Sequence, residues 1–304
     1  MNNKTDISVC TLILTYNEID KTKQCIDSVL LNDYGNNKVI LIDNGSSDDL
    51  TEHFRPIYPN IDYIRIENNI GFSGAFNAGM KNVINENHFD YFWLVSNDLK
   101  VKEDCLSKLL EVAHLDNRIG FLGPETFKNN GSGEHDLWII GLDNNENPLS
   151  HTFDNEMDTS DLNILEVEYV SGHCLLVKTD VIMDIGMMRD FSIYWEEREW
   201  QWRAKREEWI SCVVPGSICF HDRDSFGKPM NTYMRTRNFI FFNRIIFSTK
   251  PEFIKYFFLN VIYEFKWSLG MLFKRKWNFD HYFNFIKGLF HGFAREVPGF
   301  EKVK

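Results

Sequence analysis

Two aspartates stand where a short apolar run gives way to polar residues, the position at which α/β proteins commonly bind ligands. Asp98 ends PheTrpLeuValSerAsnAsp, and a carboxylate flanked by a hydroxyl and an amide suits Mg²⁺ or Mn²⁺ bridging a diphosphate. Asp43 ends LeuIleAsp, and its carboxylate can accept the ring N–H of a uracil or thymine. Turn or helix-capping chemistry is the alternative for both aspartates.

A cluster of acidic and aromatic residues follows further along the chain. It consists of Glu196, Glu197 and Glu199 beside Trp195, Trp200 and Trp202. In a partly apolar cleft a carboxylate can take the proton from an attacking hydroxyl, which is the role of a general base, and aromatic faces suit sugar rings. The alternative is a solvated helix start, where the helix dipole favours acidic residues.

Two glycines and a histidine extend the set of candidate ligand-binding residues. Gly71 and Gly74 precede a predicted helix, so the backbone there can approach a phosphate closely. His221 follows SerIleCysPhe and can complete a metal site with Asp98, although an isolated histidine is often structural. The first strand is followed by ThrTyrAsnGlu instead of the GxGxxG pattern, which argues against a nicotinamide-dependent enzyme.

These residues need a sheet to bring them together. Between residues 7 and 100, four β-branched runs alternate with helical segments and predict a parallel sheet with helices on both faces; the runs are ISVCTLILTYN, KVILIDNGS, IDYIRIEN and YFWLVSND. Each polar cluster noted in this part of the chain lies at the carboxyl end of a run, so we expect the clusters to converge.

Beyond residue 119 the alternation weakens. Strand-like runs IGFLGPETF, DLWIIG, LEVEYV and HCLLVK, with a polar loop around residues 143–162, predict a mixed sheet, and a helix is expected to begin near Glu196. The fold class is therefore α/β, with a Rossmann-like, mostly parallel mixed sheet. We assign residues 1–230 to the catalytic domain and 231–304 to an aromatic and basic helical region.

The charge and cysteine content of the chain limit the classes of molecule that it can bind and the compartment in which it works. The chain has 304 residues and a formal net charge of −11, which argues against a nucleic-acid partner. Six cysteines without a CxxC pair fit a reducing compartment, and no secretion signal is apparent, so a cytoplasmic location is expected.

The segment 251–304 differs in charge from the rest of the chain, with nine Lys or Arg residues against five Asp or Glu. Lys255, Glu264 and Lys266 interrupt its longest apolar run, so it is not expected to cross a bilayer. Phe and Trp interleaved with Lys274, Arg275, Lys276 and Lys287 favour peripheral contact with the inner face of the membrane. The alternative is contact with the catalytic domain or with a second subunit in a homo-oligomer.

The ordered set of motifs resembles the family 2 glycosyltransferases of the GT-A fold, particularly the bacterial rhamnosyltransferase-like branch. The resemblance covers about residues 8–245. It rests on ThrTyrAsnGlu at 15–18, AspAsnGlySer at 43–46, AsnIleGlyPheSerGlyAlaPheAsn at 69–77, SerAsnAsp at 96–98, TyrTrpGluGluArgGlu at 194–199, His221 with Ser225, and ArgAsn at 237–238.

The resemblance implies inverting, metal-dependent hexosyl transfer from a nucleotide diphosphate sugar to a glycan or lipid-linked acceptor in cell-surface polysaccharide synthesis. It implies Glu197 as the base, with Glu196 as the alternative, and Asp98 and His221 at Mg²⁺ or Mn²⁺. It also implies a donor site made of Thr15, Asn17, Glu18, Asp43, Asn44, Gly71, Gly74, Asn77 and Asn97. The first expected donor is dTDP-rhamnose; UDP-galactose, UDP-galactofuranose and UDP-N-acetylglucosamine follow.

The sequence departs from the family pattern at two places. Glu196-Glu197 stands where the family usually has GluAsp, and Asp98 is the single acid where a longer acidic run is common. The second departure makes weak or water-mediated metal binding an alternative. It also keeps open a different class of protein, a catalytically silent nucleotide-sugar-binding module.

Overall fold

Four parallel strands form one half of the sheet in the computed structural model of the chain. They are β1 (Val9–Thr15), β2 (Asn37–Asn44), β3 (Asp62–Ile66) and β4 (Tyr91–Ser96), in the spatial order β3-β2-β1-β4. All three pairings are parallel, and β1 is buried along its whole length. Burial on both faces explains why this strand is a continuous apolar run instead of an alternating one.

The structure describes residues 7–84, 89–136, 164–222, 229–246 and 279–303, together with positions 258, 262 and 266. Most of the expected strand DLWIIG, the polar loop at 143–162, Ser225 and the basic residues 274–276 lie outside these residues.

The second half of the sheet is mixed, as predicted. It contains β5 (Leu99–Val101), β6 (Ile119–Lys128), β7 (Leu165–Val167), β8 (Cys174–Lys178) and β9 (Ile210–His221). β8 joins the parallel half by pairing antiparallel with β4, and β6 pairs antiparallel with β8 but parallel with β9. In the described part of the chain the nine strands make one sheet.

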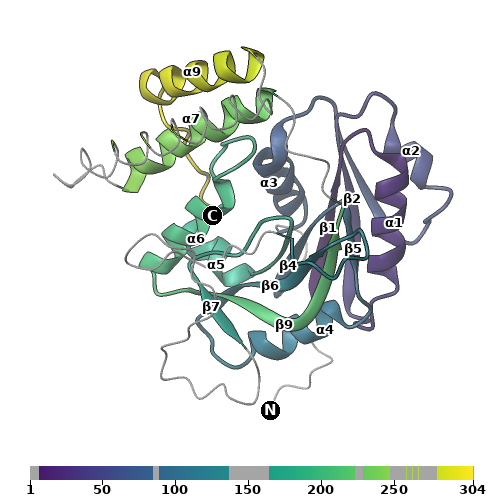
Figure 1. Ribbon diagram of the computed structural model, residues 1–304. Coiled ribbons are helices and arrows are strands. Elements are labelled where there is room, and N and C mark those ends of the chain that lie inside the picture. The colour runs from purple at the N-terminus through teal and green to yellow at the C-terminus, as the bar shows by residue number, and fades with distance from the viewer. Residues whose placement is uncertain are drawn as a thin grey trace. The chain divides into compact units, whose positions relative to one another are not determined.

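Helices cover both faces of this sheet, also as predicted (Figure 1). One core contains Ile26 of α1 (Ile19–Leu30), Phe54 of α2 (Leu50–Phe54) and Leu106 of α4 (Cys105–Ala113). The other contains Phe76 of α3 (Gly71–Ile84), Val181 of α5 (Thr179–Ile185) and Trp200 of α6 (Glu196–Arg206). Because side chains alternate along a strand, neighbouring residues of β1 contribute to opposite cores.

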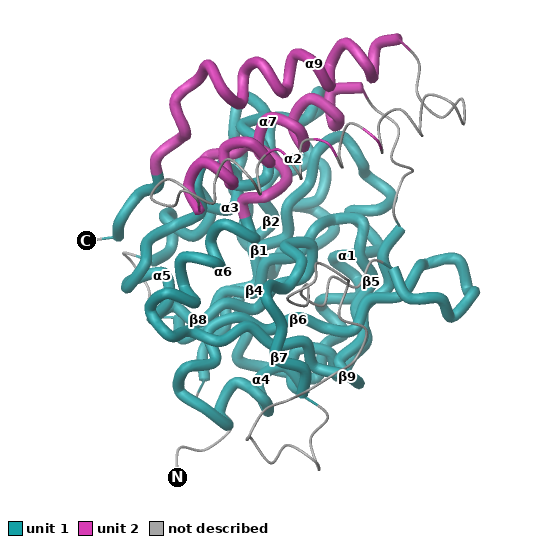
Figure 2. Tube along the Cα trace, turned by 60° about the vertical axis from the view of Figure 1, so that its left-hand side comes forward, with its two compact units in different colours: residues 1–189, 197–223, 300–304 teal, residues 190–196, 224–299 magenta. Residues whose placement is uncertain are grey.

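The chain divides into two compact units (Figure 2). The first comprises residues 1–189, 197–223 and 300–304 and holds the sheet. The second comprises residues 190–196 and 224–299 and holds α7 (Pro229–Ile246) and α9 (Phe279–Ala294), which pack side by side. In the described residues no helix combines the length and apolar character needed to cross a bilayer.

A buried amide organises the loop at residues 190–196 of the second unit. Ser192, Tyr194 and Trp195 all have positive φ angles, which are unfavourable for these residue types. Asn238 of α7 offsets this cost, because its Nδ2 donates to the carbonyl oxygens of Phe191, Ile193 and Tyr194 at 2.7–3.0 Å.

Candidate active site

The ends of β1 and β4 share a buried hydrogen-bond network. The Asn97 amide follows β4, and its Nδ2 lies 3.3 Å from Thr15 Oγ1, 3.3 Å from Glu18 Oε2 and 3.1 Å from Thr22 Oγ1. The Thr15 and Thr22 hydroxyls lie 2.6 Å apart. Three of the expected donor-site residues, Thr15, Glu18 and Asn97, are therefore in direct contact.

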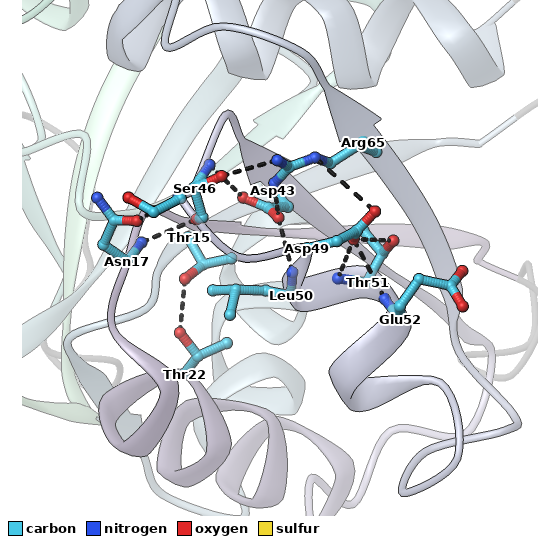
Figure 3. A network of polar contacts seen from close by, with 11 residues as sticks. Thr15, Asn17, Thr22, Asp43, Ser46, Asp49, Leu50, Thr51, Glu52 and Arg65 are labelled. Atoms are coloured by element: carbon cyan, nitrogen blue, oxygen red, sulfur yellow. Dashed lines mark hydrogen bonds and ion pairs between the residues drawn. The ribbon is translucent and has the colours of Figure 1, made fainter.

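Asp43, the last residue but one of β2, is fully buried, and its carboxylate holds the following turn (Figure 3). Oδ1 accepts from the Ser46 amide at 3.0 Å, and Oδ2 accepts from the Leu50 amide at 2.9 Å and from the guanidinium of Arg65. Turn chemistry, the alternative interpretation, accounts for these bonds. A contact of Asp43 with a nucleobase stays a proposal.

The loops after β1 and β2 are joined by reciprocal hydrogen bonds (Figure 3). The Asn17 amide donates to Ser46 Oγ at 2.8 Å, while Asn17 Oδ1 accepts from the Ser47 amide at 2.7 Å. Asn17 adopts a φ of 62°, a left-handed conformation that asparagine tolerates better than most residues. Strand ends far apart in sequence are thus fixed to each other, as the strand pattern predicted.

Asn44 positions the segment that leads into α3. Its Oδ1 accepts from the Ile70 amide at 3.0 Å, and its Nδ2 donates to Asn69 Oδ1 at 3.2 Å and to the Gly71 carbonyl at 3.1 Å. Gly71 begins α3 with a φ of 82°. These hydrogen bonds show how Gly71 is positioned, and its approach to a phosphate stays a proposal.

Gly74 and Asn77 lie farther along α3. A Cβ on Gly74 would lie 3.2 Å from Ile70, so this glycine packs closely on the preceding loop. Asn77 exchanges two hydrogen bonds with the backbone of Met188, donating to its carbonyl at 2.8 Å and accepting from its amide at 3.2 Å. In this structure the Asn77 amide fixes the 188 loop.

Asp98 and His221 are in contact, as the sequence led us to expect. His221 Nε2 lies 3.1 Å from Asp98 Oδ2, and its Nδ1 lies 2.6 Å from Asp136 Oδ2. The pairing of β5 with β9 places His221 opposite Leu99, the residue after Asp98. Ionised carboxylates only accept hydrogen bonds, so both contacts together require a protonated imidazole.

The pKa values of this pair move in opposite directions. Burial alone would lower the pKa of His221, but the hydrogen bonds and charges of Asp98 and Asp136 raise it above its usual value. Burial alone would raise the pKa of Asp98, but the hydrogen bond and charge of His221, with the charge of His173, lower it. An ionised Asp98 beside a protonated His221 is the favoured state.

His173 and Asp136 were missed by the sequence reasoning. The ring of His173 stacks on that of His221, with centroids 4.8 Å apart and an interplanar angle of 6°. His173 Nε2 lies 2.9 Å from Thr126 Oγ1, and its Nδ1 lies 2.7 Å from Ser171 Oγ. The one available signal was a histidine directly before the apolar run CysLeuLeuValLys.

Glu197 reaches the same edge of the sheet through the Gly172-His173 segment. A Cβ on Gly172 would lie 3.3 Å from Glu197 Cβ and 3.2 Å from the Phe72 ring. The carbonyl of His173 accepts from the amide of Ser96 at 2.8 Å, at the end of β4. Residues 172 and 173 therefore link Glu197 to the strand end that carries Asp98.

Glu197 is a shielded carboxylate. Its Oε2 is buried and has no hydrogen-bond partner within the described residues. Burial raises the pKa of Glu197 above its usual value, and backbone hydrogen bonds from Glu197, Arg198 and Gly172 only partly oppose this. A carboxylate with a raised pKa is suited to accept a proton near neutral pH.

Two further glutamates lie beside Glu197. Glu196, the alternative base, is the first residue of α6 and is 2% exposed, so burial does not distinguish it from Glu197. Glu199 is fully buried and pairs with Arg189 at 2.8 Å and Arg203 at 2.9 Å. Glu199 therefore joins two arginines inside the first unit.

The residues fit a divalent cation only in part. Asp98 Oδ1 is buried without a hydrogen-bond partner among the described residues, so a hard oxygen ligand is available. His221 can ligate only after losing a proton from Nε2. Among the described residues no group of three acidic, histidine or cysteine side chains could hold a metal. Any cation at Asp98 would therefore need further ligands besides these side chains.

The sequence pattern of Glycosyl transferase family 2 matches residues 10–186. The chain belongs to this family. The low-salt glycan biosynthesis hexosyltransferase Agl10 of Haloferax volcanii is 23% identical over 98% of this chain and 94% of its own length. The poly-beta-1,6-N-acetyl-D-glucosamine synthase of Staphylococcus aureus (strain MSSA476) is 26% identical over 72% of this chain. The chain covers 54% of that synthase, about half its length.

Solved structures confirm the expected GT-A fold. The mannosyltransferase PcManGT from Pyrobaculum calidifontis, in complex with GDP-Man and Mn²⁺, has a TM-score of 0.58 and 11% identity over 80% of this chain and 66% of its own. GalNAc-T7 with UDP, GalNAc and Mn²⁺ has a TM-score of 0.59 and 14% identity over 81% of this chain and 51% of its own. The rhamnosyltransferase-like branch stays a prediction.

Proposed function

We propose that the chain transfers a hexosyl group from a nucleotide diphosphate sugar to a hydroxyl of a glycan or lipid-linked acceptor, with inversion at the anomeric carbon. The observation that carries this proposal is the link from Glu197 through Gly172 and His173 to the strand end that holds Asp98. A shielded carboxylate with a raised pKa and an ionised carboxylate with a free oxygen then share one edge of the sheet.

Glu197 acts as the general base. As the acceptor oxygen bonds to the anomeric carbon, its proton passes to the Glu197 carboxylate and the carbon–oxygen bond to the diphosphate breaks. The nucleoside diphosphate leaves with that electron pair. Because the attacking oxygen and the leaving group lie on opposite sides of the anomeric carbon, the configuration inverts.

Asp98, together with the nucleotide's phosphates, would hold Mg²⁺ or Mn²⁺, and the cation would offset the charge of the leaving diphosphate. His221 keeps the Asp98 carboxylate oriented through Oδ2 and leaves Oδ1 for the cation. PcManGT and GalNAc-T7, whose folds this chain shares, were solved with Mn²⁺. Both similarities support a divalent metal without choosing between the two ions.

The nucleoside binds beside the loops that follow β1 and β2, near Thr15, Asn17, Glu18, Asp43 and Asn97. Asp43 can accept a hydrogen bond from a nucleobase only if its hydrogen bonds to protein donors rearrange. Without that rearrangement, its contribution is to fix the turn after β2. Gly71 and Gly74 of α3, with Asn44 and Asn77, line the diphosphate or donor sugar.

The donor sugar is the finer part of the proposal. The family resemblance favours rhamnose carried by dTDP. The relatives are named as a hexosyltransferase and an N-acetylglucosamine polymer synthase, which supports hexose and N-acetylglucosamine donors equally. Galactosyl, galactofuranosyl and N-acetylglucosaminyl donors therefore belong in the same test. We propose further that the acceptor belongs to cell-surface polysaccharide or glycan synthesis at the cytoplasmic face of the membrane.

A panel of nucleotide sugars tests the proposal in two steps. Thermal shift with and without Mn²⁺ selects the donor, since a ligand that binds only the folded state raises its melting temperature. Donor turnover is then measured for the native chain and for Glu197→Gln. Saturable, Mn²⁺-stimulated turnover that the variant loses supports transfer. Donor binding without any turnover, with acceptor-containing membranes present, instead identifies a catalytically silent nucleotide-sugar-binding module.

A further inference from the structure

Helix α9 in the second unit has an unusual distribution of side chains. The residues it buries are His281, Phe285, Gly288 and Gly292. The large apolar residues that it exposes are spaced four and three residues apart and lie along one side of the helix. They are Phe279 (79% exposed), Phe283 (58%), Ile286 (43%), Phe290 (67%) and Phe293 (49%). We call these five residues the α9 stripe.

The buried side of α9 is built for close approach to α7. A Cβ on Gly288 would lie 2.8 Å from the carbonyl oxygen of Tyr233, and one on Gly292 would lie 2.6 Å from Ile240 Cβ. Both contacts are closer than real side chains allow, so only glycine fits at these positions. Small residues between helices and large apolar residues on the outer side are typical of helices whose outer side meets lipid.

The charge of the C-terminal segment indicates what kind of surface binds the α9 stripe. Residues 251–304 hold nine Lys or Arg against five Asp or Glu, whereas the whole chain carries −11. The exposed charged residues within and just after α9 are Asp280, Lys287, Arg295 and Glu296, so the basic excess belongs to the segment 251–304 as a whole. A symmetric dimer through α9 would bring two basic segments together, which opposes that contact. Anionic lipid headgroups complement the same charges.

We propose that α9 docks on membranes that contain anionic lipid, with the α9 stripe inserted at the boundary between headgroups and acyl chains. An interfacial helix of this kind lies in the plane of the surface and needs apolar area together with basic charge. The inference rests on the side chains of α9 and on the charge of residues 251–304, and it is independent of sugar transfer.

Flotation of the full-length chain with liposomes tests the proposal. We expect binding to phosphatidylcholine vesicles containing about one-third phosphatidylglycerol, weaker binding to pure phosphatidylcholine, and a decrease when salt is raised. The double variant Phe283→Ser/Phe290→Ser should lower the partition coefficient about tenfold or more. The matched control is Leu31→Ser/Ile57→Ser, which changes two comparably exposed residues of the first unit and should bind as the native chain does.

Several outcomes would overturn the proposal. One is a native chain that stays with the soluble fraction on anionic vesicles, and another is an α9 variant that floats as well as the control. A third is a native chain that does not bind vesicles and that light scattering shows to be a dimer, while the α9 variant is a monomer. That result would assign the α9 stripe to contact with a second copy of the chain. Circular dichroism melts of both double variants establish that each is folded, so loss of binding is not loss of structure.

Discussion

Glu197→Gln is the substitution that examines the proposed chemistry most directly. Gln keeps the size of the side chain and cannot accept the proton, so kcat should fall by about 10²–10⁴, the contribution of a positioned general base. Donor affinity, measured by calorimetry, should stay within about threefold because the residue does not bind the nucleotide in the proposed mechanism.

The same variant should change the pH dependence of activity. Burial raises the pKa of Glu197, so kcat/KM of the native chain should fall as pH decreases through a value above the usual carboxyl range. In Glu197→Gln this acid limb should disappear from the residual activity.

Stability gives an independent readout of the same carboxylate. A group whose folded pKa is raised stabilises the protein below its unfolded pKa and loses that contribution as pH rises through the folded value. Above its raised pKa the ionised Glu197 therefore costs free energy, since Oε2 is buried without a hydrogen-bond partner in the described residues. Removing the charge should gain about 1 kcal/mol, or about 2–4 °C in Tm.

The gain should grow as pH rises from the usual carboxyl range through the raised pKa of Glu197, because the unfolded chain ionises first and the native side chain only at higher pH. Glu207→Gln, which changes an exposed glutamate just beyond α6, is the matched control and should alter neither activity nor stability. Near-native turnover of Glu197→Gln, or an acid limb that survives in it, would refute the assignment of the base.

Three further substitutions probe the surroundings of this site. Asp98→Ala should weaken Mn²⁺-dependent donor binding in calorimetry by about tenfold or more and make it insensitive to EDTA, because the cation loses its carboxylate ligand. Asp136→Asn should lower the pKa of His221 in an NMR titration, since one of its two carboxylate partners becomes neutral. Gly172→Ala should destabilise the fold by about 1 kcal/mol in thermal melts, because the new methyl group crowds Phe72 and Glu197.

Each of these has an outcome that contradicts its premise. EDTA-sensitive donor binding that survives in Asp98→Ala would move the metal to other ligands. An unchanged His221 titration would mean that Asp136 does not hold the ring in solution. A Gly172→Ala variant as stable as the native chain would show that the loop gives way easily, and it would weaken the link between Glu197 and His173.

Part of the fold and of the candidate site could be predicted from the sequence alone. Apolar runs with polar residues at their carboxyl ends predicted the parallel strands β1 to β4, and the rule that such ends meet at one edge predicted that the loops after β1 and β2 converge. The start of α6 at Glu196 followed from acidic residues crowding a first turn. These features are local, so they can be read from neighbouring residues.

Strands β5 and β9 were less visible for local reasons. β5 has three residues, too few for a periodic pattern. β9 contains Pro215 and Gly216, and its register with β6 shifts there, so the run reads as two fragments separated by a turn.

Other features exist only in the tertiary structure. His221 contacts Asp136, which is 85 positions away in the sequence. Asn238 contacts Phe191 of the 190–196 loop, which is 47 positions away. The groups that hydrogen-bond to Asp43 and the residues that bury Glu197 are likewise determined by tertiary packing. Hydrogen-bond partners and burial depend on which strands and loops become neighbours, and strand order is settled by the whole sheet. The sequence therefore determined the candidate chemical groups, and the fold decided their partners, their protonation and which of them face one another.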